Sequence, residues 1–193
     1  LGYCTDVFFD EALSFIEKSK AEPFFCYLSL NAPHSPFNVP EAYYDTYKDT
    51  PGLLASQKRF YGMITNIDDN FGRLTKTLES LKLIDNTILI FTTDNGTSNG
   101  YKFNTKEKKW YGYNAQMKGT KTSEYDGGHR VPFIIQWKKG GFKAGQNFSG
   151  LSAHVDVLPT LASLTGVAYE PSKTIDGINP VSYTHLTLPT NKA

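Results

Sequence analysis

Ile88-Leu89-Ile90-Phe91-Thr92-Thr93-Asp94-Asn95-Gly96 is the stretch that decides the fold of this chain. Its first half is a β-branched and apolar run, which predicts a buried strand, and it ends in a carboxylate, a carboxamide and a glycine. Open α/β sheets bind ligands just beyond the carboxyl ends of their strands, where Asp94 and Asn95 would lie. Two adjacent oxygen donors suit a hard divalent cation. Asn-Gly is also a very common turn signal, so these nine residues alone favour an ordinary turn.

A second apolar strand, expected to be buried on both faces, is predicted at Phe24–Leu30. It runs into the loop Asn31–Pro36, in which prolines on both sides of His34 restrict the backbone to extended shapes. His34 is therefore expected on a stiff loop, at the same sheet edge as Asp94. An imidazole there can hold an anion or transfer a proton. The segment alone leaves open a surface histidine with no such role.

Amphipathic periodicity predicts helices on both sides of these strands. The predicted helices are Thr5–Lys20, Gln57–Leu83 and Asp156–Leu164, and a further strand is predicted at Val131–Trp137. Asp68 and Asp69 fall inside the long helix, where we interpret them as a solvated face rather than an acid–base pair. Helices or long crossovers separate the strands, as parallel pairing requires. The pattern predicts an α/β fold, with a mixed, largely parallel sheet and helices on both faces.

The polar segment between Thr97 and Met117 contains several aromatic residues among lysines. Trp110 and Tyr111 lie there among lysines, and aromatic faces beside ammonium groups can bind a sulfated or otherwise anionic sugar. A mobile surface loop is the other interpretation. Lys118-Gly119-Thr120 follows, and then Asp126–Pro132, whose paired glycines mark a close approach of two backbone segments.

Composition sets limits on the class of protein. The 193 residues carry a net charge of +1, which gives no support to general nucleic-acid binding, and no apolar run is long enough to span a membrane. Cys4 and Cys26 form no metal motif, and they could pair or stay free. The segment 181–193 has neither apolar periodicity nor a helix cap, and we interpret it as a non-native tail.

Three separated motifs occur in one order: Ala32–Pro36, then Thr93–Gly96, then Lys118–Thr120 with Asp126–Pro132. Together they resemble the type I sulfatases, the formylglycine-dependent arylsulfatase family with an alkaline-phosphatase-like fold. The segments Ser152–Gly166 and Thr174–Gly177 are also similar to that family. The resemblance covers residues 1–180, and it implies the C-terminal portion of a sulfatase catalytic domain whose N-terminal strands are missing.

The resemblance implies a role for several residues. Asp94 and Asn95 match a pair of metal ligands, normally for one Ca²⁺. His34 and Lys118 match groups that bind the sulfate and assist the leaving oxygen, whereas Arg130 matches a supporting position. We also expect Trp110 and Tyr111 to contact the substrate, a sulfated small molecule or polysaccharide. Family members are usually periplasmic, secreted or lysosomal, so we expect a periplasmic or secreted origin.

The chain departs from the family at the nucleophile. The motif C/S-x-P-S-R, whose cysteine or serine becomes formylglycine, does not occur around Cys4 or Cys26, and the first metal-binding aspartate pair also lacks a counterpart. The resemblance places both upstream, so we expect this chain alone to be inactive as a sulfatase. The missing strands would leave an apolar sheet edge exposed, which predicts poor solubility.

Two other functions stay open. A phosphodiester or phosphonate hydrolase of the same superfamily would use two zinc ions and Asp-His ligand pairs, whereas Asn95 follows Asp94 here. A non-catalytic relative would bind anionic glycans through the aromatic and lysine-rich segment. The presence of Asp94, Asn95, His34 and Lys118 together favours the enzyme, because a binding module does not need all four.

Overall fold

The computed structural model of the chain describes residues 2–168, 170 and 174–180, so the predicted tail at 181–193 lies outside the described residues. The chain forms two compact units, each described here by itself. The first unit comprises Leu1–Ile84 and Ile90–Ile135, and the second comprises Asp85–Leu89 and Gln136–Ala193. Within the described residues, no helix is long and apolar enough to cross a membrane.

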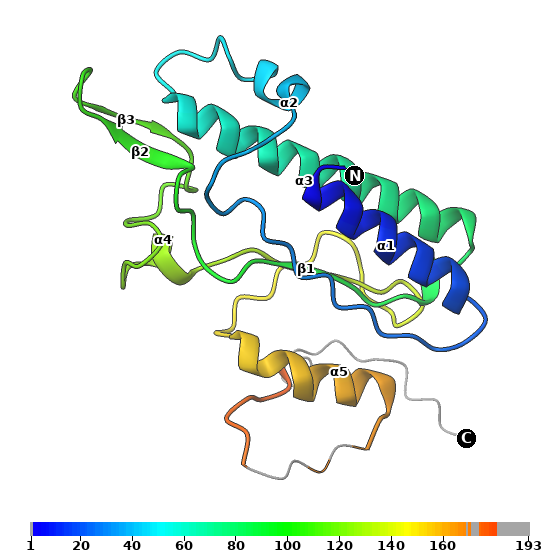
Figure 1. Cartoon of the computed structure of the whole chain (residues 1–193). Helices are drawn as coiled ribbons and strands as arrows, with labels where there is room; N and C mark the ends of the chain where they lie inside the picture. The colour runs from blue at the N-terminus through cyan, green and yellow to red at the C-terminus, as the bar shows by residue number, and fades with distance from the viewer. Residues whose placement is uncertain (1, 169, 171–173, 181–193) are drawn as a thin grey trace. The chain divides into compact units, whose positions relative to one another are not determined.

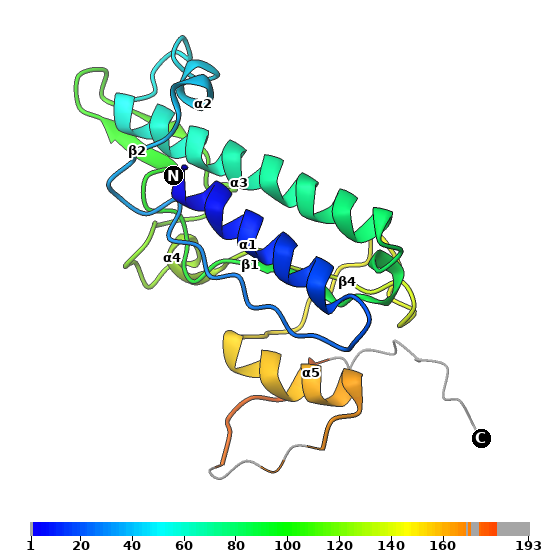
Figure 2. The ribbon, with the colours of Figure 1, turned by 45° about the vertical axis from the view of Figure 1, so that its right-hand side comes forward.

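Two long helices, α1 (Cys4–Ser19) and α3 (Ala55–Ser80), lie side by side in the first unit (Figures 1 and 2). Both predicted helices are therefore confirmed, with ends shifted by one to three residues. Their apolar faces form the best-buried core, made of Phe9, Ala12, Ile16, Phe60, Met63, Leu74 and Leu78. Asp68 and Asp69 are exposed, as predicted. The short helix α2 (Glu41–Asp45) precedes α3.

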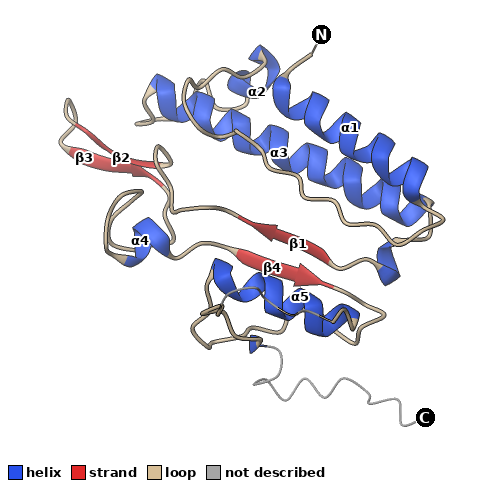
Figure 3. Cartoon of the chain, turned by 60° about the horizontal axis from the view of Figure 1, so that its bottom comes forward, coloured by secondary structure: helices blue, strands red, loops and turns tan. Residues whose placement is uncertain are grey.

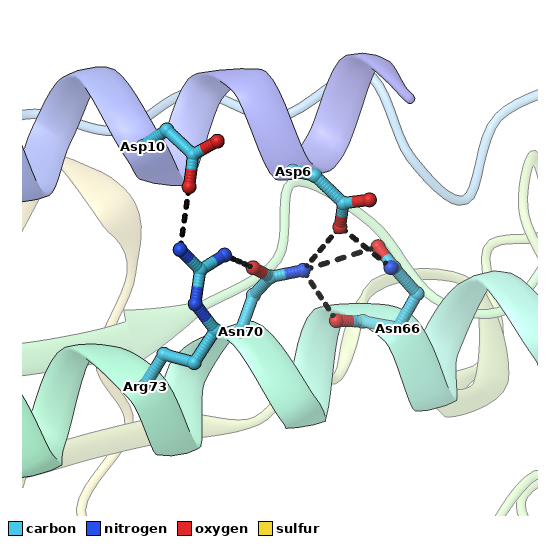
Figure 4. Close-up of polar contacts among 5 residues, drawn as sticks. All are labelled: Asp6, Asp10, Asn66, Asn70 and Arg73. Atoms are coloured by element: carbon cyan, nitrogen blue, oxygen red, sulfur yellow. Dashed lines mark hydrogen bonds and ion pairs between the residues drawn. The ribbon is translucent and has the colours of Figure 1, made fainter. Parts of the chain in front are cut away.

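A polar network joins α1 to α3 beside this core (Figure 4). The Asp6 carboxylate Oδ1 accepts hydrogen bonds from Asn66 Nδ2 at 2.8 Å and from Asn70 Nδ2 at 2.7 Å. Both asparagines are almost completely buried. A buried amide donor without a partner is costly, so Asp6 is the residue that makes these two asparagines compatible with the core.

Replacing Asp6 with alanine should lower the free energy of unfolding by about 1–3 kcal/mol, because two buried amide groups each lose one hydrogen-bond acceptor. Asp10→Ala is the matched control one helical turn away. Its carboxylate pairs with Arg73, and both side chains are about half exposed, so its loss should cost only about 0–1 kcal/mol. Urea denaturation of the three proteins measures both changes, and equal losses would contradict the assigned role of Asp6.

The strands β1 (Leu89–Thr92) and β4 (Phe133–Gln136) form a two-stranded sheet. Their arrows run in opposite directions in Figure 3. Backbone hydrogen bonds agree with this direction, because Lys139 N donates to Asp85 O before β1 begins, and Gly96 N donates to Gly128 O after β1 ends. The parallel pairing that we predicted for these strands is therefore wrong. A long connection permits parallel pairing but does not require it.

The predicted strand Phe24–Leu30 is extended but is not a strand in this structure. Burial on both faces is also wrong, because Phe25 is 75% exposed and Tyr27 is 81% exposed. A strand needs a hydrogen-bonded neighbour, and no described residue pairs with this segment. The exposed aromatic side chains agree with the expected exposed apolar edge, whereas the expected poor solubility stays a prediction.

The second unit is built around α5 (Val157–Thr165), which the short 3₁₀ turn His154–Asp156 precedes. Asp156 Oδ2 accepts from Ala153 N at 2.8 Å, and Asp156 Oδ1 accepts from Ile178 N at 2.8 Å. Gly166 ends the helix with φ +69°, the left-handed cap that its sequence predicts. A second 3₁₀ turn, Ile84–Asn86, precedes β1.

Candidate active site

The loop after β1 is fixed by the backbone of a distant glycine pair. The loop is Asp94–Gly96, and the pair is Gly127–Gly128 in the short helix α4 (Asp126–His129). Gly96 N donates to Gly128 O at 2.9 Å. A Cβ atom on Gly96 would lie 1.9 Å from Gly127 O, so only glycine fits there. The close backbone approach predicted from the paired glycines is confirmed, with the loop Asp94–Gly96 as its neighbour.

Backbone hydrogen bonds also connect the loop Lys118–Thr120 to this region. Gly127 N donates to Lys118 O at 2.8 Å, and Lys121 N donates to Thr97 O at 2.9 Å. The buried Asn114 holds this loop from inside, because its Nδ2 donates to Met117 O at 2.6 Å and to Gly119 O at 3.1 Å. We call the convergence of Asp94–Gly96, Lys118–Thr120 and Asp126–His129 the three-loop junction.

Asp94 and Asn95 offer oxygen atoms that fit a hard cation. Asp94 follows the end of β1 by two residues, and its side chain is exposed. Asn95 Nδ2 donates to Gly96 O at 2.9 Å, so its amide oxygen is the atom available to a metal. Ca²⁺ takes six to eight oxygen ligands. Within the described part of the chain, no cluster of three or more His, Cys, Asp or Glu residues could complete the site. The two residues fit the cation in chemistry and need further ligands.

Lys118 is exposed, and an aromatic ring holds its ammonium group. Lys118 Nζ lies 3.6 Å from the ring centroid of Tyr125, a cation–π contact. Tyr125 precedes α4, so the contact ties the lysine to the third loop of the junction. Sequence reasoning missed Tyr125, because nothing in the order of residues shows which aromatic ring meets the lysine. Arg130 forms an exposed ion pair with Asp126 on α4 at 3.7 Å, and the supporting role that the resemblance implies stays a prediction.

His34 lies on its own loop, apart in sequence from the junction. His34 N donates to Asn31 O at 2.9 Å, and the ring Nδ1 hydrogen-bonds to Ser35 O at 2.8 Å. The first bond closes a turn over residues 31–34, so the extended backbone that we predicted for this loop is wrong, and the second bond ties the exposed ring to the neighbouring carbonyl. In the described part of the chain, no hydrogen bond joins His34 to the three-loop junction, so its meeting with Lys118 stays a prediction.

Trp110 and Tyr111 belong to a hairpin of β2 (Tyr101–Asn104) and β3 (Lys109–Gly112). The expectation of a mobile loop is wrong for these residues, because the strands pair in a regular antiparallel register. Neighbouring residues of a strand point to opposite faces. Trp110 and Tyr111 therefore cannot contact one ligand from the same face. Tyr111 borders an open cavity of about 400 Å³ that Tyr47, Tyr61 and Tyr113 also line.

A buried asparagine of the Asp94 loop also escaped the sequence analysis. Asn99 is 1% exposed, and neither atom of its amide group has a hydrogen-bond partner among the described residues. Such a group normally meets water, an ion or another part of the protein. Asn99 lies five residues after Asp94, so it marks this loop as one whose polar contacts are incomplete.

The structure thus has an α/β class in which an exposed carboxylate, an amide oxygen and an ammonium group lie on loops that backbone contacts of glycines join beyond the end of β1. Comparison with known proteins gives the family. A family model described as Sulfatase matches residues 1–167. The chain belongs to the sulfatase family, and the resemblance read from its motifs is confirmed.

Individual relatives agree with this assignment. Human N-acetylgalactosamine-6-sulfatase is 32% identical over 177 residues, which cover 91% of this chain and 31% of the relative. N-acetylgalactosamine-6-O-sulfatase of Bacteroides thetaiotaomicron is 34% identical over 164 residues, with 82% and 30% covered. The crystal structure of Ps i-CgsB in complex with k-i-k-neocarrahexaose superposes with a TM-score of 0.78 at 31% identity, covering 94% of this chain and 38% of that one. This chain thus spans about a third of the length of these relatives, and the alkaline-phosphatase-like α/β class that we predicted agrees with its structural neighbours.

Proposed function

We propose that this chain is part of a protein that hydrolyses sulfate esters. The observation that supports the proposal is the three-loop junction, whose backbone hydrogen bonds join the loops that carry Asp94, Asn95 and Lys118 in a chain of the sulfatase family. Formylglycine as the nucleophile is part of the proposal, and the C/S-x-P-S-R motif that would supply it does not occur in these 193 residues.

The chemistry of the junction suits this reaction. Negative charge builds on the departing oxygen when a sulfate ester is cleaved, and positive groups aimed at that charge accelerate the reaction. A divalent cation held by Asp94 and Asn95, for which we propose Ca²⁺, would supply positive charge at the sulfate. The Lys118 ammonium group donates hydrogen bonds to a sulfate oxygen. His34, in its protonated form, gives a proton to the leaving oxygen.

Sulfated polysaccharide is the proposed substrate class. The Ps i-CgsB structure contains a neocarrahexaose, and the human and Bacteroides relatives are named for a sulfated amino sugar. Lysines and aromatic rings close to the junction in sequence, between Tyr101 and Tyr113, agree with an anionic sugar polymer. We also propose that the protein is periplasmic or secreted, where such polymers occur.

A direct experiment tests the proposed reaction and its rivals. We would express the gene with its flanking sequence, assay an aryl sulfate and a phosphate diester, and determine the bound metal. Sulfate release, abolished by a calcium chelator and restored by Ca²⁺, is the expected result. Two bound zinc ions per chain, together with hydrolysis of the phosphate diester, would show instead that the protein is a phosphodiesterase. Binding of sulfated glycans without any hydrolysis would replace the proposal by the non-catalytic reading.

The 193-residue chain by itself should release no sulfate from an aryl sulfate above the uncatalysed rate, because it carries no formylglycine motif. The measurement is a sulfate-release assay of the purified chain with and without added Ca²⁺. Turnover that survives repurification and disappears in Asp94→Asn would show that the reaction does not need the upstream nucleophile.

A further inference from the structure

The β2–β3 hairpin has two faces with different surroundings. Its register pairs Phe103 with Trp110 and Lys102 with Tyr111. Directly opposed residues of an antiparallel pair share a face, and successive residues alternate. Tyr101, Phe103 and Trp110 therefore lie on one face, which we call the tryptophan face. Tyr111 lies on the other face, together with Lys102 and Lys109.

The face that carries Tyr111 is held against the rest of the first unit. Gln57, which is completely buried on α3, donates its Nε2 hydrogen to Tyr111 O at 3.0 Å. Asn104 Nδ2 donates to Gly52 O at 3.3 Å. The Tyr111 hydroxyl donates to Glu107, and this hydrogen bond raises the pKa of Tyr111. The hairpin is thus anchored on this side, which fixes the direction of the opposite face.

The tryptophan face is open and ordered. Tyr101 and Trp110 stack with ring centroids 4.9 Å apart and ring planes within 16° of parallel, and Phe103 lies 5.7 Å from Trp110. Trp110 is nevertheless 51% exposed and Phe103 is 42% exposed. Three aromatic rings that pack together at the surface, on a hairpin anchored from behind, form a patch of the kind that binds ligands.

The charge around this patch selects the kind of ligand. The hairpin from Tyr101 to Tyr113 contains four lysines, at positions 102, 106, 108 and 109, and a single acid, Glu107. Glu107 is engaged by the Tyr111 hydroxyl. None of the ion pairs found between described residues includes a hairpin lysine. Lys106 and Lys108 are exposed in the turn at the end of the tryptophan face, where they can reach an anion bound along it.

We propose that the tryptophan face is a docking surface for a sulfated polysaccharide, in which sugar rings rest on Trp110 and its aromatic neighbours while sulfates meet Lys106 and Lys108. A pyranose ring presents C–H groups on its faces, and the negative face of an aromatic ring attracts them. Ammonium groups at the turn add attraction that depends on salt. The choice of a sulfated sugar polymer rests on the proposed function, whereas the binding surface itself rests on the geometry of the hairpin.

Binding of chondroitin 6-sulfate and of unsulfated chondroitin to the 193-residue chain, without any catalysis, tests the proposal. A Trp137→Phe background leaves Trp110 as the only tryptophan, so its fluorescence reports contact directly. The sulfated polymer should bind more tightly and shift the Trp110 emission. Trp110→Ala should weaken binding about tenfold, as measured by calorimetry. Tyr27→Ala, which removes an aromatic side chain that is 81% exposed outside the hairpin, should bind as the parent does.

Variants that remove only surface charge test the proposal without removing a packed aromatic ring. Lys106→Gln/Lys108→Gln should weaken binding about three- to tenfold and flatten its dependence on salt. Lys20→Gln/Lys76→Gln removes the same charge from exposed positions of the first unit and should change neither. Unaltered binding in Trp110→Ala and in the hairpin lysine variant would overturn the proposal. Tighter Trp110-dependent binding of oligothymidylate would replace the polysaccharide by a nucleic acid. These binding measurements do not depend on whether the longer protein hydrolyses sulfate esters.

Discussion

Asp94→Asn should reduce sulfate-ester turnover of the longer protein by about 10²–10³-fold, the size expected when one group that stabilises transition-state charge is lost. The replacement keeps an oxygen atom and the size of the side chain but removes the negative charge. A hard divalent cation is held mainly by charged oxygens, so we expect weaker calcium binding together with the lower kcat. Because Asp94 is exposed and follows β1, the fold should tolerate the change.

Glu124→Gln is the matched control for Asp94→Asn. Glu124 is exposed just before α4, and the change removes the same charge close to the junction in sequence. Its turnover and calcium affinity should stay within about twofold of the parent, because surface charges act weakly through screened solvent. Calcium titration and steady-state kinetics on the three proteins separate the effects. Full activity and unchanged calcium affinity in Asp94→Asn would show that the charge of Asp94 does not hold the cation, whereas parallel losses in both variants would point to the general electrostatic field.

The sequence located the candidate site because the residue types that bind charged ligands follow an apolar strand. Asp94 and Asn95 could be found in this way, since strand ends are where open sheets bind ligands. The contacts of their loop with the Lys118 loop and with Gly128 could not be predicted. They are backbone hydrogen bonds, which the types of the side chains do not reveal. The paired glycines gave the only hint, as they mark a close approach without naming its partner.

The pairing direction of β1 and β4 and the burial of Phe24–Leu30 were harder to predict from the sequence, for two physical reasons. The segment between Thr93 and Pro132 is long enough for a parallel crossover, yet it holds the β2–β3 hairpin and α4, and β4 returns antiparallel to β1. Burial of Phe24–Leu30 depends on neighbouring strands, and the described residues supply none. A local pattern shows that a segment is apolar, whereas its partners decide whether it becomes a buried strand.

Gly96→Ala should disrupt the three-loop junction, and it is expected to affect both stability and activity. The new Cβ atom would lie 1.9 Å from Gly127 O, a backbone atom that cannot rotate away. The two loops must separate, which breaks the hydrogen bond from Gly96 N to Gly128 O. We expect a loss of about 1–3 kcal/mol in the free energy of unfolding of the chain. In the longer protein, turnover should fall by about 10²-fold, because Asp94 moves with its loop.

Gly72→Ala supplies the comparison that separates this steric mechanism from the general effect of adding a methyl group. Gly72 lies within α3, and a Cβ atom there meets nothing within 4 Å. Alanine should stabilise the helix by about 0.5–1 kcal/mol, since glycine is a poor helix former. Denaturation of both variants therefore gives shifts of opposite sign if the Gly96 contact is as close as the structure shows. If Gly96→Ala unfolds at the same urea concentration as the parent chain and keeps its turnover, the loops are free to part. In that case the backbone contact with Gly127 and Gly128 does not position Asp94.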